Sequence, residues 1–213
     1  SIMPVWGELT MDNQKRGMRF SHENEKAAPD CYQVKFDNGV STALSATSRG
    51  AVFEITYPSE EGQYIVVDAY QHGGSVVWNK EENCIYGITH YNNGGVPENF
   101  ANYFIIEFDK PVVESGIDEN SCAYVKFQLE AGEKMTVRTA SSFISHDQAR
   151  LNFNREVAGR SLAEVSAEAK KIWNDQLGRI QVEGGTHEQQ KTFYSCLYRT
   201  LLFPREFYEF DSD

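Results

Sequence analysis

The hydrophobic pattern of this chain changes its period once, near residue 145, and this change restricts the folds that the chain can adopt. From about residue 31 to residue 144, apolar side chains recur at every second position, as in a strand with one buried face. Beyond residue 145 they recur about every 3.6 residues, as in a helix. Because strands and helices are segregated along the chain, two structural units are indicated rather than a parallel α/β sheet.

The first unit has the pattern of an antiparallel β-sandwich. "CYQVKF" (31–36) and "AVFEITY" (51–57) place their apolar residues on one face, and "DNG" (37–39) is a strong hairpin turn signal. Five further segments follow: "QYIVVDAY", "CIYGITHY", "NYFIIEFD", "AYVKFQL" and "KMTVRTASSFI". Seven or eight strands without intervening helices predict a sandwich, since two sheets can bury each other's apolar faces.

The second unit is predicted to be helical because three helix starts can be found. Each pairs an N-cap hydroxyl with a long polar side chain three residues on: Ser145 with Gln148, Ser161 with Glu164, and Thr186 with Gln189. The second helix is expected to end near Gly178. The predicted fold class is therefore mainly β with C-terminal helices, two or three in number.

The last predicted helix is apolar around most of its circumference. Phe193, Cys196, Leu197 and Leu201 share one face, and other apolar residues lie on the remaining faces. Such a helix favours burial on every side. The sequence predicts that a helical domain begins here, or that the chain associates with itself through this helix.

Composition excludes several classes of partner. The chain has 20 basic and 31 acidic residues, a formal net charge of −11, which repels nucleic acid and anionic membranes. No run of eighteen apolar residues and no signal-peptide pattern occurs, so neither a transmembrane segment nor a leader is expected in these 213 residues.

Four cysteines are widely spaced along the chain: Cys31, Cys84, Cys122 and Cys196. The absence of a C-x-x-C pair or a Cys/His cluster argues against structural zinc. Each lies in an apolar segment, where a free cysteine usually behaves as a small buried hydrophobe, so burial is expected for all four.

Four stretches together resemble a known enzyme family. They are "RFSHENEKAAPDCYQVKF", "NNGGVPENFANYFIIEFDKP", "SFISHDQARLNFNREV" and "IQVEGGTHEQQKTFYSCLYRTLLFPREFYEFD". In order and over nearly the whole chain, they are similar to glycoside hydrolase family 92, the calcium-dependent exo-acting α-mannosidases of Bacteroides-like gut bacteria. In that family an N-terminal β-sandwich is joined by linker helices to a catalytic (α/α)6 barrel, with the active site between them.

The resemblance implies a division of the chain. Residues 1–144 correspond to the sandwich, incomplete at its start, residues 145–183 to the linker helices, and residues 184–213 to the first helix of a truncated (α/α)6 domain. A segment with an "FSHTHLSGTG"-like motif is expected before this chain, and a "WDT"-like motif with most of the barrel after it. The resemblance thus implies a fragment, inactive alone, whose general acid, general base and calcium ligands lie outside it.

The activity that the resemblance implies for the full-length protein is inverting hydrolysis of terminal α-mannosides of glycans, with α-1,2 linkages favoured. A mannose-containing glycan and the missing catalytic domain are the expected partners. Calcium is the expected cofactor of the full-length enzyme, and none is expected in the fragment. A periplasmic, cell-surface or secreted location is expected for the same reason.

One loop is the main candidate for substrate binding. "HYNNGGVPENFANYF" (90–104) separates two strands by more residues than an ordinary hairpin needs, and long loops on rigid scaffolds often bind ligands. A sugar-binding site needs flat aromatic faces for the C–H surfaces of the sugar and amides for its hydroxyl groups. The loop's candidates are Tyr91, Asn92, Asn93, Asn99 and Phe100. The structural alternative is that the asparagines and glycines only form turns and that Phe100 packs in the core.

Other polar residues are weaker candidates. His72, in "QHGG", and Arg205, after Pro204, are substrate-binding candidates, although solvation is the favoured explanation for His72 and an interface ion pair for Arg205. The acidic residues near the end of the chain read as a solvated loop: Glu206, Glu209 and Asp211. "HENE" (22–25) reads as a polar loop and not as a metal site.

Two other functional classes stay open on the residues alone. The sandwich could be a non-catalytic carbohydrate-binding module, which predicts saturable mannose binding. Alternatively, the helices could dock on another polypeptide, because Phe193, Leu197 and Leu201 offer an apolar face.

Overall fold

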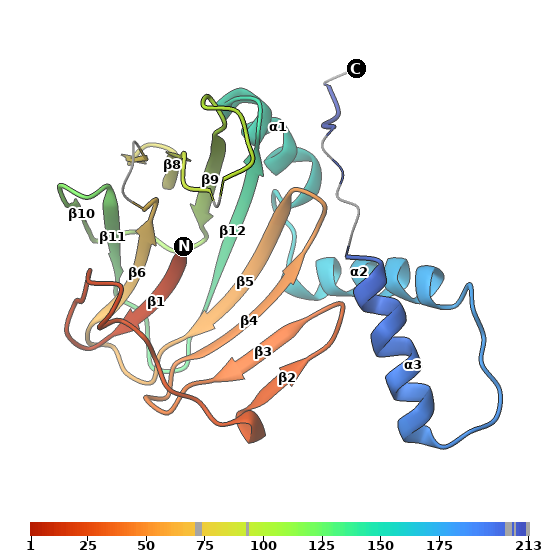
Figure 1. Ribbon diagram of the computed structural model, residues 1–213. Helices are drawn as coiled ribbons and strands as arrows, with labels where there is room; N and C mark the ends of the chain where they lie inside the picture. The colour runs from red at the N-terminus through yellow and green to blue at the C-terminus, as the bar shows by residue number, and fades with distance from the viewer. Residues whose placement is uncertain (71–73, 93, 203–205, 207, 212–213) are drawn as a thin grey trace.

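The computed structural model describes residues 1–70, 74–92, 94–202, 206 and 208–211, and Figure 1 shows its architecture. The strands are β1 (Ile2–Trp6), β2 (Glu25–Ala27), β3 (Tyr32–Lys35), β4 (Ser41–Ala46), β5 (Gly50–Thr56), β6 (Gln63–Asp68), β7 (Ser75–Asn79), β8 (Cys84–Thr89), β9 (Asn102–Phe108), β10 (Glu114–Ile117), β11 (Cys122–Phe127) and β12 (Lys134–Ser142). The helices are the 3-10 turn η1 (His22–Asn24), α1 (His146–Glu156), α2 (Leu162–Leu177) and α3 (His187–Thr200).

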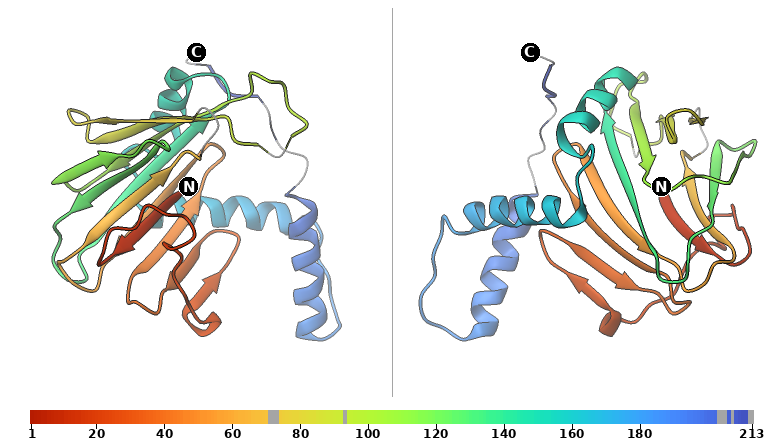
Figure 2. Two further views of the ribbon diagram at one scale, coloured as in Figure 1. Left: turned by 60° about the vertical axis from the view of Figure 1, so that its left-hand side comes forward. Right: turned by 180° about the vertical axis from the view of Figure 1, so that it is seen from behind.

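The strands form two antiparallel sheets that pack face to face, as Figure 2 shows. The smaller sheet has the order β1-β6-β11-β10, and the larger has the order β2-β3-β4-β5-β12-β9-β8-β7. The predicted mainly β fold with C-terminal helices, an antiparallel sandwich followed by three helices, is confirmed.

The predicted number of strands is wrong. Within residues 31–144 the described chain forms β3 to β12, more than the seven or eight expected, and β1 and β2 precede them. The strands missed by the pattern are mostly sheet edges: β1, β2, β7 and β10. Edge strands are often short and need not bury an apolar face, so they carry a weak alternation signal. The fifth strand that the pattern missed is β4, "STALSA", in which small polar residues obscure the alternation of apolar and polar positions.

The space between the sheets is the main core. Its fully buried side chains come from both sheets and include Ile55, Ile65, Ile106, Val125 and Met135, each at most 1% exposed. Close packing of β-branched and aromatic residues from two facing sheets removes their apolar area from water. This core fixes the ends of the strands, from which the loops emerge.

A second core lies on the outer face of the larger sheet. There Val52 of β5 and Ile105 of β9 pack against α1 and the start of α2, through Phe153, Val157 and Val165. The strands β5, β9 and β12 are therefore covered on both faces, and α1 and the start of α2 are packed on the sandwich.

The three predicted helix starts are confirmed, with one difference. Ser161 and Thr186 each form a complete capping box. Ser145 accepts a hydrogen bond from the Gln148 backbone N–H, but the Gln148 amide donates to Asn152 and to the Phe210 carbonyl instead of returning to the cap. Gly178 is the C-cap of α2, and with φ −71° it stays right-handed.

The helix α3 extends away from the sheets, and none of its residues is buried (Figure 1). Its main contact is with α2, where the rings of Tyr198 and Trp173 lie 4.7 Å apart. Leu201 and Leu202, at its end, are 40% and 45% exposed. The burial expected for this helix is therefore not provided by the described residues.

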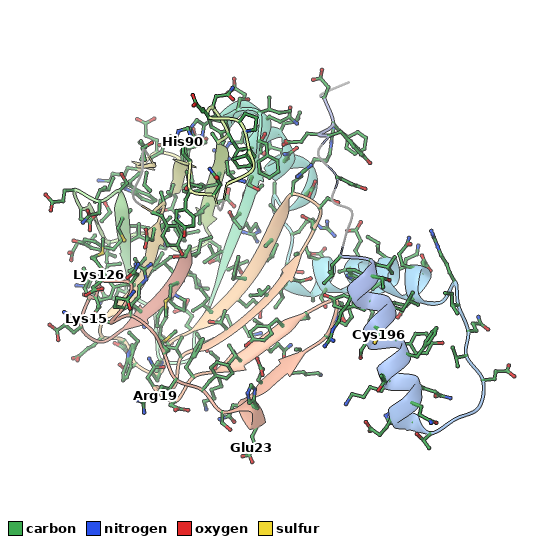
Figure 3. The ribbon with its side chains drawn as sticks, in the orientation of Figure 1. Lys15, Arg19, Glu23, His90, Lys126 and Cys196 are labelled. Atoms are coloured by element: carbon green, nitrogen blue, oxygen red, sulfur yellow. The ribbon has the colours of Figure 1, made fainter. Side chains whose placement is uncertain are left out.

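The cysteines differ in burial. Cys84 and Cys122 are buried as expected, Cys31 is half-buried, and Cys196 lies exposed on α3, where Figure 3 labels it. The expectation of burial is wrong for Cys196, because the described residues do not cover that face of α3. All four thiols are free.

The "HENE" segment, residues 22–25, forms η1 and the start of β2, with His22 Nδ1 2.7 Å from Glu25 Oε2.

In the part of the chain that the structure describes, no helix combines the length and the hydropathy that a membrane crossing needs.

Candidate functional site

The candidate site lies where the β8–β9 loop meets the ends of β6 and β12. His90 begins the loop, and its Nδ1 lies 2.9 Å from the Phe100 carbonyl, which draws the two ends of the loop together. Figure 3 labels His90 at this rim of the sandwich. Asn92 accepts from the Gly94 backbone N–H at 2.8 Å and donates to the His90 carbonyl. Its amide is thus used in the turn, as the structural alternative predicts.

Two tyrosines form an aromatic wall at this rim. The rings of Tyr70 and Tyr91 are stacked, with centroids 5.0 Å apart and an angle of 29°. Tyr91 is about half exposed, and Tyr70 is one-third exposed. Tyr70 has φ +59°, in the left-handed region that residues other than glycine rarely adopt. Its backbone N–H donates to Asp68 Oδ1 at 2.8 Å, which holds this conformation.

Asp68 is itself held by a buried ion pair. Its Oδ2 accepts from Arg16 Nη2, and Arg16 Nη1 donates to the Met11 carbonyl at 2.8 Å. Arg16 and Asp68 are 7% and 8% exposed. Burial alone would lower the pKa of Arg16, but its hydrogen bond to Asp68 and the charge of Asp68 raise it overall. The pair anchors the turn from which Tyr70 projects.

A cavity of about 540 Å³ opens beside this wall. Its aromatic lining is Tyr70, Tyr91, Phe100, Phe104 and Phe143, and its polar lining includes Asp68, Thr89, Asn102 and Ser141. The rings of Phe100 and Phe143 lie 5.3 Å apart. A neighbouring hollow of about 590 Å³ shares Asp68, Tyr70 and Tyr91 with it. Flat rings beside hydroxyl and amide groups suit the mixed polar and apolar faces of a sugar.

The structure brings together only part of the predicted site. Tyr91 and Phe100 both line the cavity, while the exposed Asn99 does not. Asn93, His72 and Arg205 lie outside the described residues, so these candidates stay predictions. Phe100 is half-buried at the cavity and does not belong to the main core.

Sequence reasoning missed residues that lie at strand ends. Tyr70 follows β6 and Phe143 follows β12, and each could be read only as the end of an apolar segment. Their meeting depends on the order of strands in two sheets. The one available signal was that aromatic residues recur at the ends of several predicted strands.

The acidic residues near the end of the chain are not all solvated. Glu206 and Asp211 are exposed, but Glu209 is half-buried and accepts from the Phe143 backbone N–H and from Asn152 Nδ2, at 2.8 and 2.7 Å. The interpretation as a solvated loop is therefore wrong for Glu209, because the chain turns back onto α1 and brings this carboxylate to two donors.

The described residues do not fit a metal site. Nowhere in them do three or more His, Cys, Asp or Glu side chains gather in a way that could hold an ion. Asp68, the carboxylate of the cavity lining, is already paired with Arg16. No step of a reaction is therefore assigned to a metal held by these residues.

Sequence comparison places the chain in a family. Residues 1–142 match the glycosyl hydrolase family 92 N-terminal domain, and residues 148–213 match the glycosyl hydrolase family 92 catalytic domain. The chain belongs to glycosyl hydrolase family 92. The family match covers both sheets, and the catalytic-domain match begins within α1.

Solved structures of family 92 members share the fold. The family GH92 inverting mannosidase BT2199 from Bacteroides thetaiotaomicron is 56% identical, with a TM-score of 0.95 over 99% of this chain and 30% of its own. The family GH92 α-mannosidase BT3965 of the same species is 26% identical, with a TM-score of 0.88 over 99% of this chain and 32% of its own, and it has also been solved in complex with mannoimidazole.

A curated relative comes from a fungus. An uncharacterized secreted glycosidase of Arthroderma benhamiae is 20% identical over 239 residues, which cover 91% of this chain and 30% of the relative. The chain thus spans about a third of the length of the family 92 proteins it resembles.

Proposed function

We propose that this chain supplies the β-sandwich and the first helices of an inverting exo-α-mannosidase that removes terminal α-1,2-linked mannose from glycans. The observation that carries the proposal is the 56% identity to an inverting family 92 mannosidase over 99% of the chain. Agreement at a TM-score of 0.95 means that the sandwich and the helices follow the same path in both proteins.

In this proposal the cavity beside Tyr70 and Tyr91 contacts the glycan. The C–H face of a mannose ring packs on the exposed ring of Tyr91, and its hydroxyls bond to amides such as Asn102. Phe100 closes the inner side. The sandwich thus binds and orients the sugar while the chemistry is done elsewhere.

Inverting hydrolysis needs a general acid and a general base whose carboxyl groups lie about 6.5–9.5 Å apart. Because Asp68 is committed to Arg16, we place both groups outside this chain, together with the ligands of calcium. When bound, calcium would supply positive charge at the substrate, and the residues of this chain would only hold the sugar.

The test compares the 213-residue chain with the complete product of its gene on α-1,2-, α-1,3- and α-1,6-mannobiose. We expect no mannose release by the chain alone and release by the complete product, fastest from the α-1,2 substrate. Proton NMR should show β-mannose as the first product, and a chelator should stop the reaction.

Three outcomes would contradict parts of this proposal. Turnover by the chain alone that a chelator abolishes would place the carboxylates and the metal within these residues. Early α-mannose would exclude inversion. Preference for another linkage would exclude the α-1,2 assignment.

We also propose that the protein is exported to the periplasm or the cell surface, or is secreted. What supports this is that the fungal relative is described as secreted. Fractionation of the source cells with an antibody against this chain is the measurement, and recovery from the cytoplasm would oppose the proposal.

A second candidate function is sugar binding without catalysis, which the open aromatic wall favours. Titration calorimetry should then show saturable binding of mannose or mannobiose to the chain. Tyr91→Ala should weaken it at least about tenfold, because packing of the sugar's C–H face on an exposed ring is lost. Tyr194→Ala, on α3, is the control. The absence of heat at millimolar sugar would remove this candidate.

A further inference from the structure

The end of the described chain returns to the sandwich. Residues 206 and 208–211, here called the C-terminal segment, follow α3 in the sequence and pass the corner where β12 meets α1 (Figures 1 and 2). The segment is far in sequence from that corner, and it has no helix or strand of its own. Side chains of the corner must therefore hold it.

Three side chains hold the main chain of the segment. Arg49 Nη2, from the β4–β5 turn, donates to the carbonyls of Glu206 and Tyr208 at 2.9 and 2.8 Å. From α1, Gln148 Nε2 donates to the Phe210 carbonyl at 2.7 Å, and Arg155 Nη2 donates to the Asp211 carbonyl at 2.6 Å. These bonds hold the backbone of the segment at four carbonyls.

Glu209 is the side chain of the segment that enters the corner. Its two carboxylate oxygens accept from the Phe143 backbone N–H and from Asn152 Nδ2, at 2.8 and 2.7 Å. Asn152 is 2% exposed and also donates to the Ser141 carbonyl at 3.0 Å, so its amide is held in place. Hydrogen bonds to an ionised acceptor are stronger than neutral ones. Glu209 thus binds two prearranged donors.

The same contacts reach the wall of the cavity. Phe143, whose N–H bonds Glu209, places its ring 5.3 Å from that of Phe100. The guanidinium of Arg49 lies over the ring of the same Phe143, 5.5 Å from the ring centroid. Arg49 and Glu209, two of the residues whose contacts fasten the segment, therefore both contact Phe143. A loosened segment would free Phe143 to leave Phe100.

We propose that Glu209 is a positioning residue that docks the C-terminal segment on the β12–α1 corner and, through Phe143, sets the Phe100 wall of the cavity. The proposal rests on the proposed function in one respect, that this cavity holds the sugar. By this contact, the start of the catalytic domain and the sugar-contacting rim of the sandwich are fixed to each other.

The test uses the full 213-residue chain with Glu209→Gln, which keeps the shape but turns an N–H₂ toward one of the two donors. Glu206→Gln is the matched control, because Glu206 is an exposed glutamate of the same segment. Two readouts need no sugar: hydrogen exchange at the Phe143 amide and the NMR cross-peak between the Phe100 and Phe143 rings. Circular dichroism checks that each variant is folded.

We expect Glu209→Gln to speed exchange at the Phe143 amide at least about tenfold and to weaken the ring cross-peak, while Glu206→Gln changes neither. Wild-type exchange in Glu209→Gln, an intact cross-peak, or an equal effect of Glu206→Gln would overturn the proposal. A mannose titration of the same proteins separates the proposed sugar site from the proposed role of Glu209. If none of the proteins binds mannose, the sugar site is opposed. The exchange rate and the ring cross-peak still decide the role of Glu209, because neither measurement needs sugar.

Discussion

At the scale of single residues, the cysteines show how position changes the chemistry of one side chain. All four lie in segments with similar apolar patterns, and nothing in those patterns separates them. In the structure Cys84 and Cys122 are buried in packed clusters, and burial raises the pKa of each thiol to about 11. Cys196 is exposed because its helix packs mainly on α2, and the described residues leave that side chain uncovered.

The raised pKa values predict a loss of stability at high pH. Unfolded thiols ionise near pH 9 while the folded ones stay protonated to about 11, so stability is complete below pH 9 and falls as the pH rises through 11. Each thiol should cost about 2–3 kcal/mol over that window. Urea unfolding at pH 8, 9.5 and 11 measures it. Removing both thiols by Cys84→Ala and Cys122→Ala should flatten the slope, and Cys196→Ala should not.

A single glycine is required in β8. Gly87 faces Phe104 of β9 across the sheet, and an added Cβ would overlap that ring. Phe104 packs against the main core and lines the cavity. Gly87→Ala should lower the free energy of unfolding by about 1–3 kcal/mol. Gly17→Ala, where a Cβ meets nothing within 4 Å, is the control. An equal effect of the two would refute the packing argument.

At the scale of elements, α2 and α3 begin with the same sequence signal but have different surroundings. Both carry a complete capping box. The helix α2 buries Leu162, Val165 and Ala169 against the sandwich, whereas α3 buries no residue. The helix start can be read from local sequence, while the packing depends on what lies opposite.

This difference predicts different effects of the same cap removal. Ser161→Ala should lower the free energy of global unfolding by about 1 kcal/mol, because α2 unfolds together with the sandwich. Thr186→Ala should leave global unfolding unchanged and raise hydrogen exchange only within α3, which opens locally. Urea unfolding and residue-level exchange measure the two effects. A global loss in Thr186→Ala would mean that α3 is part of the cooperative unit.

The elements that sequence reasoning found were those with a buried face. The central strands β5, β9 and β12 have long apolar patterns, and the helices have clear caps. The short edges β2 and β10 bury little, so no pattern marks them. The site was harder to predict because Tyr70 and Phe143 meet Tyr91 and Phe100 only through the folding of distant strands.

At the scale of the whole molecule, apolar area gathers on the helical end. Exposed residues there include Ile172, Ile180, Val182, Leu201 and Leu202. The family match assigns residues 148–213 to the catalytic domain, and this chain covers only about a third of its solved relatives. In the 213-residue chain, water must cover these side chains unless another surface does.

We therefore expect the isolated chain to associate at high concentration. Ile172→Lys with Leu201→Lys should raise the dissociation constant at least about tenfold, because charge is placed on the apolar face. Val113→Lys with Ile117→Lys adds the same charge to similarly exposed residues on the sandwich and is the control. Light scattering over a concentration series measures this. A monodisperse monomer at every concentration would contradict the expectation.

The position of β12 has a consequence for biosynthesis. This last strand of the sandwich lies between β5 and β9, so residues 50–56, which pair with β4 on one side, find their second partner only in residues 134–140. On the ribosome, β2 to β5 emerge early, with β5 unpaired on the side that β12 later fills, and β7 to β9 emerge as a separate group. The larger sheet joins these two groups only when its central strand has been made, so the nascent chain exposes pairing edges for most of its synthesis, and non-local pairing of this kind is slow.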